Sequence, residues 1–207
     1  DISLPATLIK LDGLLKNMDN LAIKSNLVEQ RLKIPDNLWP IIADYYKIEL
    51  MFHNLFINAI QAMPDGGQLA IEAENIVINH DSVPSLQRGK YVMVTLSDEG
   101  EGIDPNHITD IFDPYFSTRE YGSGLGLSEV YSIVTNHGGY IQVQSTKGVG
   151  SVFYIYLPAK PEEGEGENED GKIEPKKSST KRTREKNILI LDDDQLLSES
   201  LQMILYN

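Results

Sequence analysis

Apolar residues recur three or four positions apart in three stretches of the chain, a spacing that is typical of helices with one apolar face. These stretches are Ser3–Asn20, Tyr45–Met63 and Leu127–His137. The turn sequence Pro64-Asp65-Gly66-Gly67 ends the second stretch, and Gly138-Gly139 ends the third. The pattern therefore predicts three helices.

Apolar and polar residues alternate in other stretches, and this alternation predicts strands. We expect Gln68–Asn79 and Lys90–Ser97 to pair across a polar loop, and Tyr140–Ser145 and Ser151–Leu157 to form a hairpin. The order of elements predicts an α/β fold, a two-layer sandwich in which helices cover one face of a mixed sheet. The predicted strands are Asn26–Pro35, Gln68–Asn79, Lys90–Ser97, Tyr140–Ser145 and Ser151–Leu157.

The pattern changes after residue 160. Pro161–Lys186 is first acidic and then basic, and it is too polar to bury a core. We expect a flexible linker there, with its basic half a solvated spacer rather than a nucleic-acid or membrane patch. Asn187–Leu191 predicts a short strand, followed by acidic residues and helical spacing to the end. The expected division is therefore a domain over 1–160, a linker over 161–186 and the truncated start of another domain over 187–207.

Composition narrows the function classes. The chain has 207 residues, enough for one full globular domain, and a net charge of −13. That charge argues against a general nucleic-acid binder. No apolar run is long enough for a membrane helix, and we expect no signal peptide. The absence of cysteine excludes disulfides and thiolate metal sites and fits the cytoplasm.

Two asparagines, Asn54 and Asn58, stand four positions apart on the second predicted helix, so their amides share one face. An amide carbonyl can serve as an oxygen ligand for Mg²⁺ without adding charge. Taken alone, the pair would more often be ordinary surface polar residues.

Two glycine-rich loops carry further candidate chemistry. Asp98-Glu99-Gly100-Glu101-Gly102 follows a predicted apolar strand, and its carboxylate could accept a hydrogen bond from an exocyclic amine while the glycines admit a flat ligand. Gly122–Leu127 opens the third helix and could offer backbone N–H groups to an anion. Its spacing matches neither the dinucleotide-binding fingerprint nor the Walker A loop.

An aromatic segment, Ile111–Arg119, lies between these two loops. Its rings could anchor a lid that also opens, and Arg119 could pair with a phosphate. A small satellite core filled by the same rings is an equally acceptable interpretation.

The four motifs occur in one order at close spacing, and together they resemble the catalytic, ATP-binding domain of sensor histidine kinases. This domain belongs to the superfamily that also holds DNA gyrase, the heat-shock chaperone ATPase and the mismatch-repair ATPases. The resemblance covers roughly Ile34–Pro158 and implies the Bergerat-type ATP-binding fold. Its motifs are His53–Ala59 (N box), Asp98–Gly102 (first glycine box), Phe112–Phe116 (F box) and Gly122–Leu127 (second glycine box).

The resemblance implies a role for each motif. Asn58 would coordinate the Mg²⁺ that bridges the ATP phosphates, with Asn54 nearby on phosphate or metal. Asp98 would hold the adenine amino group, and Phe112–Arg119 would form the mobile ATP lid. The glycine boxes would shape the floor of the site and bring amides to the phosphates. The expected site residues are Asn54, Asn58, Asp98, Gly100, Gly102, Phe112, Thr118, Arg119, Gly122, Gly124, Leu125 and Gly126.

The resemblance also bears on the reaction. Gyrase-like branches activate water with a carboxylate four residues before the metal-binding Asn, and here that position is Asn54, which cannot act as a general base. This favours transfer of the γ-phosphoryl group of ATP to a histidine. None of His53, His80, His107 and His137 lies in a helical hairpin before the domain, so we expect the acceptor on a dimerisation domain absent from this chain.

The end of the chain carries a second resemblance. Ile188–Asp194 resembles the first strand and acidic loop of a response-regulator receiver domain, in which Asp192 and Asp193 would help to bind Mg²⁺. A receiver behind the ATP-binding domain is the arrangement of a hybrid histidine kinase. The implied partners are ATP, Mg²⁺, a histidine phosphotransfer or dimerisation domain and a receiver domain. We expect no nucleic acid, no membrane contact by this segment, and a monomer.

Three alternatives stay open at this point. The chain could be an ATP-hydrolysing member of the superfamily, which would release phosphate steadily. It could be an anti-sigma-type Ser/Thr kinase, although the receiver-like end and the full F box speak against this. It could also be a degenerate module used only for protein contact, which would bind no nucleotide.

Overall fold

A computed structural model of the chain describes residues 6–17, 27–79, 86–119 and 122–160. All of these residues belong to one unit, Asp1–Glu163. The expected linker over 161–186 and the receiver-like segment over 187–207, with Asp192 and Asp193, lie outside the described residues. Both stay predictions.

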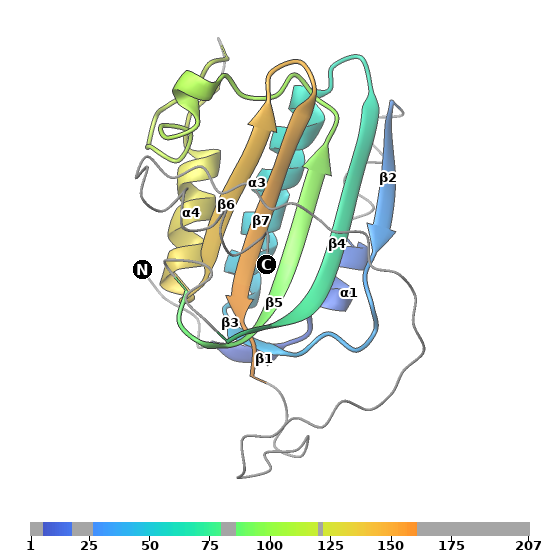
Figure 1. The fold of residues 1–207 in the computed structure, drawn as a ribbon, viewed down its shortest axis with the longest axis vertical. Helices are drawn as coiled ribbons and strands as arrows, with labels where there is room; N and C mark the ends of the chain where they lie inside the picture. Colours follow the sequence, from blue (N-terminus) through green and yellow to red (C-terminus); the bar gives the residue numbers. More distant parts are fainter. Residues whose placement is uncertain (1–5, 18–26, 80–85, 120–121, 161–207) are drawn as a thin grey trace, which may run out of the picture. The chain divides into compact units, whose positions relative to one another are not determined.

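The described strands form a mixed five-stranded sheet and a separate two-stranded one. They are β1 (Thr7–Ile9), β2 (Val28–Lys33), β3 (Ile41–Ala43), β4 (Gly67–Ile78), β5 (Gly89–Asp98), β6 (Tyr140–Thr146) and β7 (Gly150–Pro158). The large sheet has the order β2-β4-β5-β7-β6, in which β2 runs parallel to β4 and the other pairs are antiparallel (Figure 1). β1 and β3 pair antiparallel with each other. The central strand β5 is therefore paired along its length with β4 on one side and with β7 on the other.

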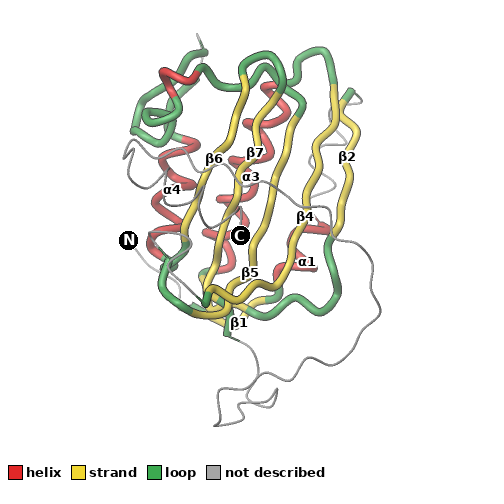
Figure 2. The backbone as a smooth tube through the Cα atoms, viewed as in Figure 1, coloured by secondary structure: helices red, strands yellow, loops and turns green. Residues whose placement is uncertain are grey.

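Helices cover one face of the large sheet. They are α1 (Leu11–Asn17), α3 (Tyr45–Ala62) and α4 (Gly126–Asn136), and all three lie behind the sheet in the view of Figures 1 and 2. A short 3-10 helix, η1 (Pro105–His107), precedes α4. This arrangement confirms the predicted two-layer α/β sandwich. Within the described ranges, no helix has both the length and the hydropathy needed to cross a membrane.

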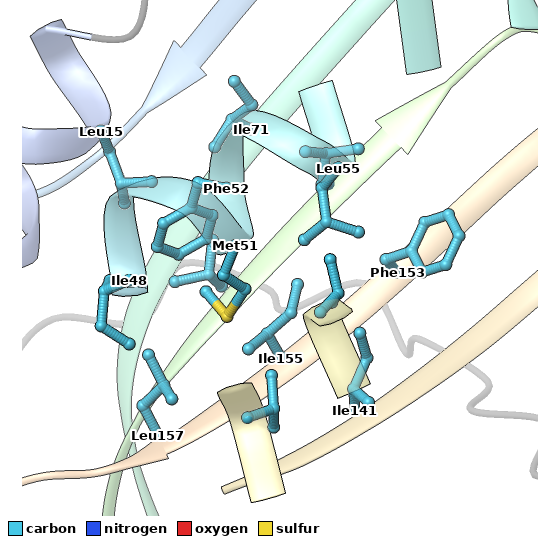
Figure 3. Close-up of a cluster of buried hydrophobic side chains, with 14 of the residues drawn as sticks. Leu15, Ile48, Met51, Phe52, Leu55, Ile71, Ile141, Phe153, Ile155 and Leu157 are labelled. Atoms are coloured by element: carbon cyan, nitrogen blue, oxygen red, sulfur yellow. The ribbon is translucent and has the colours of Figure 1, made fainter. Parts of the chain in front are cut away.

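The main core lies between α3 and the inner face of the sheet (Figure 3). Successive turns of α3 bury Ile48, Met51, Phe52, Leu55, Phe56 and Ala59. The sheet contributes alternate residues, among them Ile71 of β4 and Phe153, Ile155 and Leu157 of β7. The helix repeat gives α3 one apolar side, and the alternation along each strand gives the sheet one apolar face. These two apolar surfaces pack together to form the core.

Polar contacts fix the end of α3 that lies away from the glycine loops. The Asp44 carboxylate caps the helix by accepting hydrogen bonds from the N–H groups of Tyr46 (3.0 Å) and Lys47 (3.3 Å). The backbone N–H of Asp44 donates to Nε2 of His137 at 3.2 Å, and Nδ1 of the same ring lies 2.7 Å from the carbonyl oxygen of Ile133. The ring thereby joins the C-terminal end of α4 to the N-terminal end of α3.

The predicted helix over Ser3–Asn20 is wrong in part. Thr7–Ile9 is strand β1, paired with β3, and the helix is confined to Leu11–Asn17 within the described residues. Leu8 is exposed and pairs with Ile42 instead of joining the buried stripe of α1. The three-residue strand β3 was not predicted. The other predicted helices and strands are confirmed, with ends that shift by one to two residues.

The core predicts a difference between two residues of α3 that lie two positions apart. Phe52 is fully buried, whereas Leu50 is 39% exposed. Phe52→Ala should lower the free energy of unfolding by about 3–5 kcal/mol, because it leaves a cavity in close-packed surroundings. Leu50→Ala should lower the free energy of unfolding by well under half as much. Urea unfolding followed by circular dichroism measures both, and equal losses would contradict the described packing.

Candidate functional site

A pocket of about 410 Å³ opens where the C-terminal half of α3 meets the loop after β5 and the turn between β6 and β7. Of the three buried polar or charged side chains among the described residues, two line this pocket, Asp98 and Ser151. Buried polar groups need partners, so their gathering in one cavity marks a candidate binding site. The lining residues are Asn58, Ala59, Ala62, Asp98, Glu101, Gly102, Ile103, Asp104, His107, Ile111, Phe116, Thr118, Arg119, Lys147, Ser151 and Phe153.

Asp98 is the last residue of β5, and its side chain is 5% exposed. Strand alternation places it in line with the buried apolar residues Val94 and Leu96, on the face that meets the helices. Burial raises the pKa of the carboxyl group. Backbone N–H donation from Gly100, at 2.9 Å, and from Ser151 acts in the opposite direction, as does the charge of Arg119. The structure thus holds a desolvated hydrogen-bond acceptor at the inner end of the pocket.

The first glycine loop is clamped between α3 and the β6–β7 turn. Glu101 donates its backbone N–H to the carbonyl oxygen of Ala62 at 2.9 Å, and Gly148 donates to that of Glu101 at 2.7 Å. Gly102 has φ +64°, and a Cβ there would lie 2.1 Å from the carbonyl oxygen of Thr146. The close approach of backbone to backbone therefore requires glycine at position 102. Gly102 lines the pocket, and Gly100 does not.

The two asparagines of the N box have different surroundings. Asn58 lines the pocket, and its Nδ2 is buried without a hydrogen bond to any described residue. The same atom lies 3.6 Å from the place where a Cβ on Gly126 would stand. Asn54 lies outside the pocket lining, and its Nδ2 donates to a carboxylate oxygen of Glu129 on α4 at 2.9 Å. An unpaired buried N–H donor is costly, so Nδ2 of Asn58 is available to an acceptor atom of a ligand.

The F box is anchored by its rings. Phe112 packs against Tyr131 of α4 with ring centroids 5.6 Å apart, and Phe116 packs against His107 at 5.3 Å. Both phenylalanines are partly buried against the main core instead of filling a separate satellite core, and the lid interpretation stays a prediction. Phe116 lines the pocket, and Phe112 does not.

The segment that follows the F box contributes to the wall of the pocket. Thr118 and Arg119 both line it. The Arg119 guanidinium donates to Oε1 of Gln61 on α3 at 2.8 Å and to Oε1 of Glu101 at 3.3 Å. These contacts tie the segment to α3 and to the first glycine loop, and they place a cation in the pocket lining.

The second glycine loop lies outside the pocket lining, which contains none of Gly122, Gly124, Leu125 and Gly126. Gly124 has φ +66°, and a Cβ there would lie 2.3 Å from the carbonyl carbon of Tyr115. Gly124 therefore allows the loop to pack against the F box. Leu125 is the N-cap of α4 and makes no side-chain capping bond, and Gly126 begins the helix.

Sequence reasoning did not single out several lining residues as site residues. Lys147, on the β6–β7 turn, pairs with Asp104 at 2.9 Å between Nζ and Oδ2. Ser151 stands directly opposite Asp98 in the antiparallel register of β5 and β7. The hairpin was predicted, but its register against β5 was not, and that register is the signal that could have found Ser151.

Comparison with known proteins identifies the family. The family described as "Histidine kinase-, DNA gyrase B-, and HSP90-like ATPase" matches residues 43–161, which is more than half of the chain. The chain belongs to this family. The match contains the N box, both glycine boxes and the F box, and it confirms the resemblance inferred from those motifs. It does not extend to the receiver-like end.

Named relatives are sensor kinases. Sensor kinase CckA of Brucella abortus is 33% identical over 174 residues, which cover 81% of this chain and 18% of CckA. Sporulation kinase E of Bacillus subtilis is 32% identical over 155 residues, 74% of this chain and 20% of that protein. Sensor histidine kinase ZraS of Escherichia coli is 37% identical over 134 residues, 65% of this chain and 26% of ZraS. The chain thus spans about a fifth to a quarter of these proteins.

Solved structures show the same fold. The catalytic domain of histidine kinase ThkA is 26% identical, with a TM-score of 0.63, over 75% of this chain and 97% of that domain. The mycobacterial sensor histidine kinase MprB is 21% identical with a TM-score of 0.62, over 75% of this chain and 99% of the matched chain. The predicted ATPase fold of the superfamily is confirmed.

The buried state of Asp98 predicts how one substitution changes stability with pH. Because burial raises the pKa of Asp98 above its ordinary value of 3.8, ionisation opposes folding. The stability of the wild type is therefore lowered as the pH rises through the folded pKa. Asp98→Asn is neutral and retains an acceptor oxygen, so it should remove this loss.

Urea unfolding between about pH 3 and about pH 8 tests this prediction. The free energy of unfolding of Asp98→Asn minus that of the wild type should be smallest at the lowest pH, grow as the pH rises and then level off. Asp65→Asn, at an exposed turn, is the control and should show no such rise. A difference that is constant with pH would contradict the argument.

Proposed function

We propose that this chain is the ATP-binding catalytic domain of a sensor histidine kinase. The observation that carries the proposal is the pairing of a buried acceptor, Asp98, with an unpaired buried amide, Asn58, in one pocket. The first suits the amino group of a base, and the second, an unused N–H donor, suits the phosphate end of a nucleotide. Membership of the family and the names of the relatives support this assignment.

At the adenine end, the ionised Asp98 would accept a hydrogen bond from the exocyclic amine. A carboxylate has about four lone-pair sites, so the two backbone donors leave room for a ligand. The Ser151 hydroxyl, beside Asp98, can act as donor or acceptor toward a ring nitrogen or a bridging water. Gly102 and Ile103 offer backbone and an apolar surface to the flat base.

At the phosphate end, Asn58 would contribute its carbonyl oxygen to the magnesium ion that accompanies ATP. Bound there, the ion would neutralise phosphate charge and hold the terminal phosphate in place. Arg119, which lines the pocket, would supply positive charge to the phosphates. The N-terminus of α4 lies beside Asn58, at Gly126, and has no side-chain cap from Leu125. Its N–H groups suit an anion. The other expected contacts of the second glycine box stay part of this proposal.

We further propose that the γ-phosphoryl group passes to a histidine on a dimerisation domain. Asn54, at the position where a hydrolase would carry its base, has no basic group and donates its amide to Glu129. Without a base at that position, positioning and charge neutralisation would carry the catalysis. This proposal does not favour ATP hydrolysis as the main activity.

The hybrid arrangement is also proposed, on the sequence of residues 188–194 alone. Ile188–Leu191 followed by Asp192 and Asp193 is typical of the start of a receiver domain, and it stands behind the ATP-binding domain. In an intact receiver those two carboxylates would help to bind Mg²⁺.

Asn58→Ala should weaken binding of ATP in the presence of magnesium by at least about tenfold, because it removes a ligand from a buried site. Isothermal titration of the chain with ATP, with Mg²⁺ and with excess chelator, measures this. Asn136→Ala, at the exposed end of α4, is the matched control and should bind as the wild type does. Unchanged binding by Asn58→Ala would contradict the assigned metal end. If the wild type bound no ATP, the proposed function would be overturned. The alternative of a degenerate module used only for protein contact would then be favoured.

A further inference from the structure

The Asn54 amide and the Glu129 carboxylate form a contact that the motifs did not predict. Nδ2 of Asn54 on α3 donates to Oε2 of Glu129 on α4 at 2.9 Å. A hydrogen bond to an ionised acceptor is among the stronger kinds. Glu129 lies in the first turn of α4, two residues after the end of the second glycine box. The contact therefore joins the N box to the helix that the second glycine box begins.

Helices α3 and α4 approach each other at two places, about one helical turn apart. Asn58 faces Gly126 at the start of α4, with its Nδ2 3.6 Å from the place of a Cβ on that glycine. One turn back along α3 and one turn onward along α4, Asn54 meets Glu129. One helical turn rises about 5.4 Å. The carboxylate thus lies about one turn away from the amide that we assign to the metal and the phosphates.

The contact also fixes the orientation of the Asn54 amide. Because Nδ2 and Oδ1 diverge from the same carbon, a bond from Nδ2 to Glu129 settles on which side Oδ1 lies. The Asn54 side chain is half-buried and the Glu129 side chain is exposed. An outer partner of this kind orients a metal ligand and tunes the charge around it.

We propose that Glu129 is a positioning residue that makes nucleotide binding depend on the divalent cation. The inference rests on the proposed function, since it requires the phosphates of ATP to lie beside Asn58. A carboxylate near the positive end of α4 competes with the phosphates for that end and repels them when no metal is present. The same carboxylate attracts a hydrated Mg²⁺, directly through its charge and indirectly through Asn54.

The test substitutes Glu129→Gln. The glutamine carbonyl can still accept the hydrogen bond from Asn54, so the contact between the helices is kept while the negative charge is removed. Thermal unfolding should therefore occur at nearly the same temperature as in the wild type. Glu49→Gln removes the same charge from an exposed position on α3, outside the pocket and away from the contact, and serves as the matched control.

The readout is the dissociation constant of ATP, measured once with excess Mg²⁺ and once with excess chelator. One unit charge about one helical turn from the amide assigned to the phosphates, in partly aqueous surroundings, corresponds to a change of about tenfold. In Glu129→Gln, metal-free ATP should bind several-fold more tightly than in the wild type. The enhancement by Mg²⁺ should fall by about tenfold. A purely structural role of Glu129 would not change this ratio.

Each other outcome overturns the inference. An unchanged ratio in Glu129→Gln would show that the carboxylate does not sense the metal or the phosphates. An equal change in Glu49→Gln would show a general effect of net charge. Absence of ATP binding by the wild type under both conditions would overturn the proposed function itself, and it is distinguished from the first two outcomes because those require wild-type binding.

Discussion

A carboxylate at the end of the central strand is the feature on which the site depends, and close backbone packing makes it tolerable. Asp98 would be costly to bury alone. Its oxygens are satisfied by N–H groups of Gly100 and Ser151, which belong to the loop after β5 and to the neighbouring strand β7. The loop can turn back on the carboxylate only because residue 102 is glycine, since a Cβ there would clash with the β6–β7 turn. Similarly, a Cβ on Gly150 would lie 2.1 Å from the carbonyl oxygen of Asp98.

Helix α3 connects this end of the sheet with the rest of the domain. Its apolar face packs on the sheet, and polar residues make the contacts at its N-terminal and C-terminal ends. Asp44 and His137 fix the N-terminal end, while Asn58 lines the pocket near the C-terminal end. The position of Asn58 relative to Asp98 therefore depends on the packing of the whole helix. The core and the site are consequences of one arrangement.

Much of the fold could be predicted from the sequence, because periodicity was strong in the long elements. α3 and α4 have uninterrupted apolar stripes, and the predicted β6–β7 hairpin has its turn marked by glycines. β1 escaped prediction because Leu8 fits both a helical stripe and a strand, and only its pairing with Ile42 decides between them. β3 is too short for a pattern to show.

The site was predictable where chemistry is local and not where it depends on register. Asp98 and Asn58 could be picked out because they stand in short motifs. Ser151 and Lys147 come to the pocket through the pairing of β7 with β5 and through the turn of the hairpin. Asn54 was expected beside the phosphates or metal, and its bond to Glu129 depends on how α4 lies against α3, which no local pattern encodes.

Discrimination between ATP and GTP tests the central claim most directly, because it asks what Asp98 accepts. Guanine carries a carbonyl oxygen where adenine carries its amino group. With GTP, two acceptors would face each other in a desolvated pocket, so GTP should bind at least about a hundredfold more weakly than ATP. Competition of unlabelled ATP and GTP against a fluorescent ATP analogue measures this ratio. Equal affinities for ATP and GTP would contradict the assignment of Asp98 to the adenine amino group, and with it the account of the pocket.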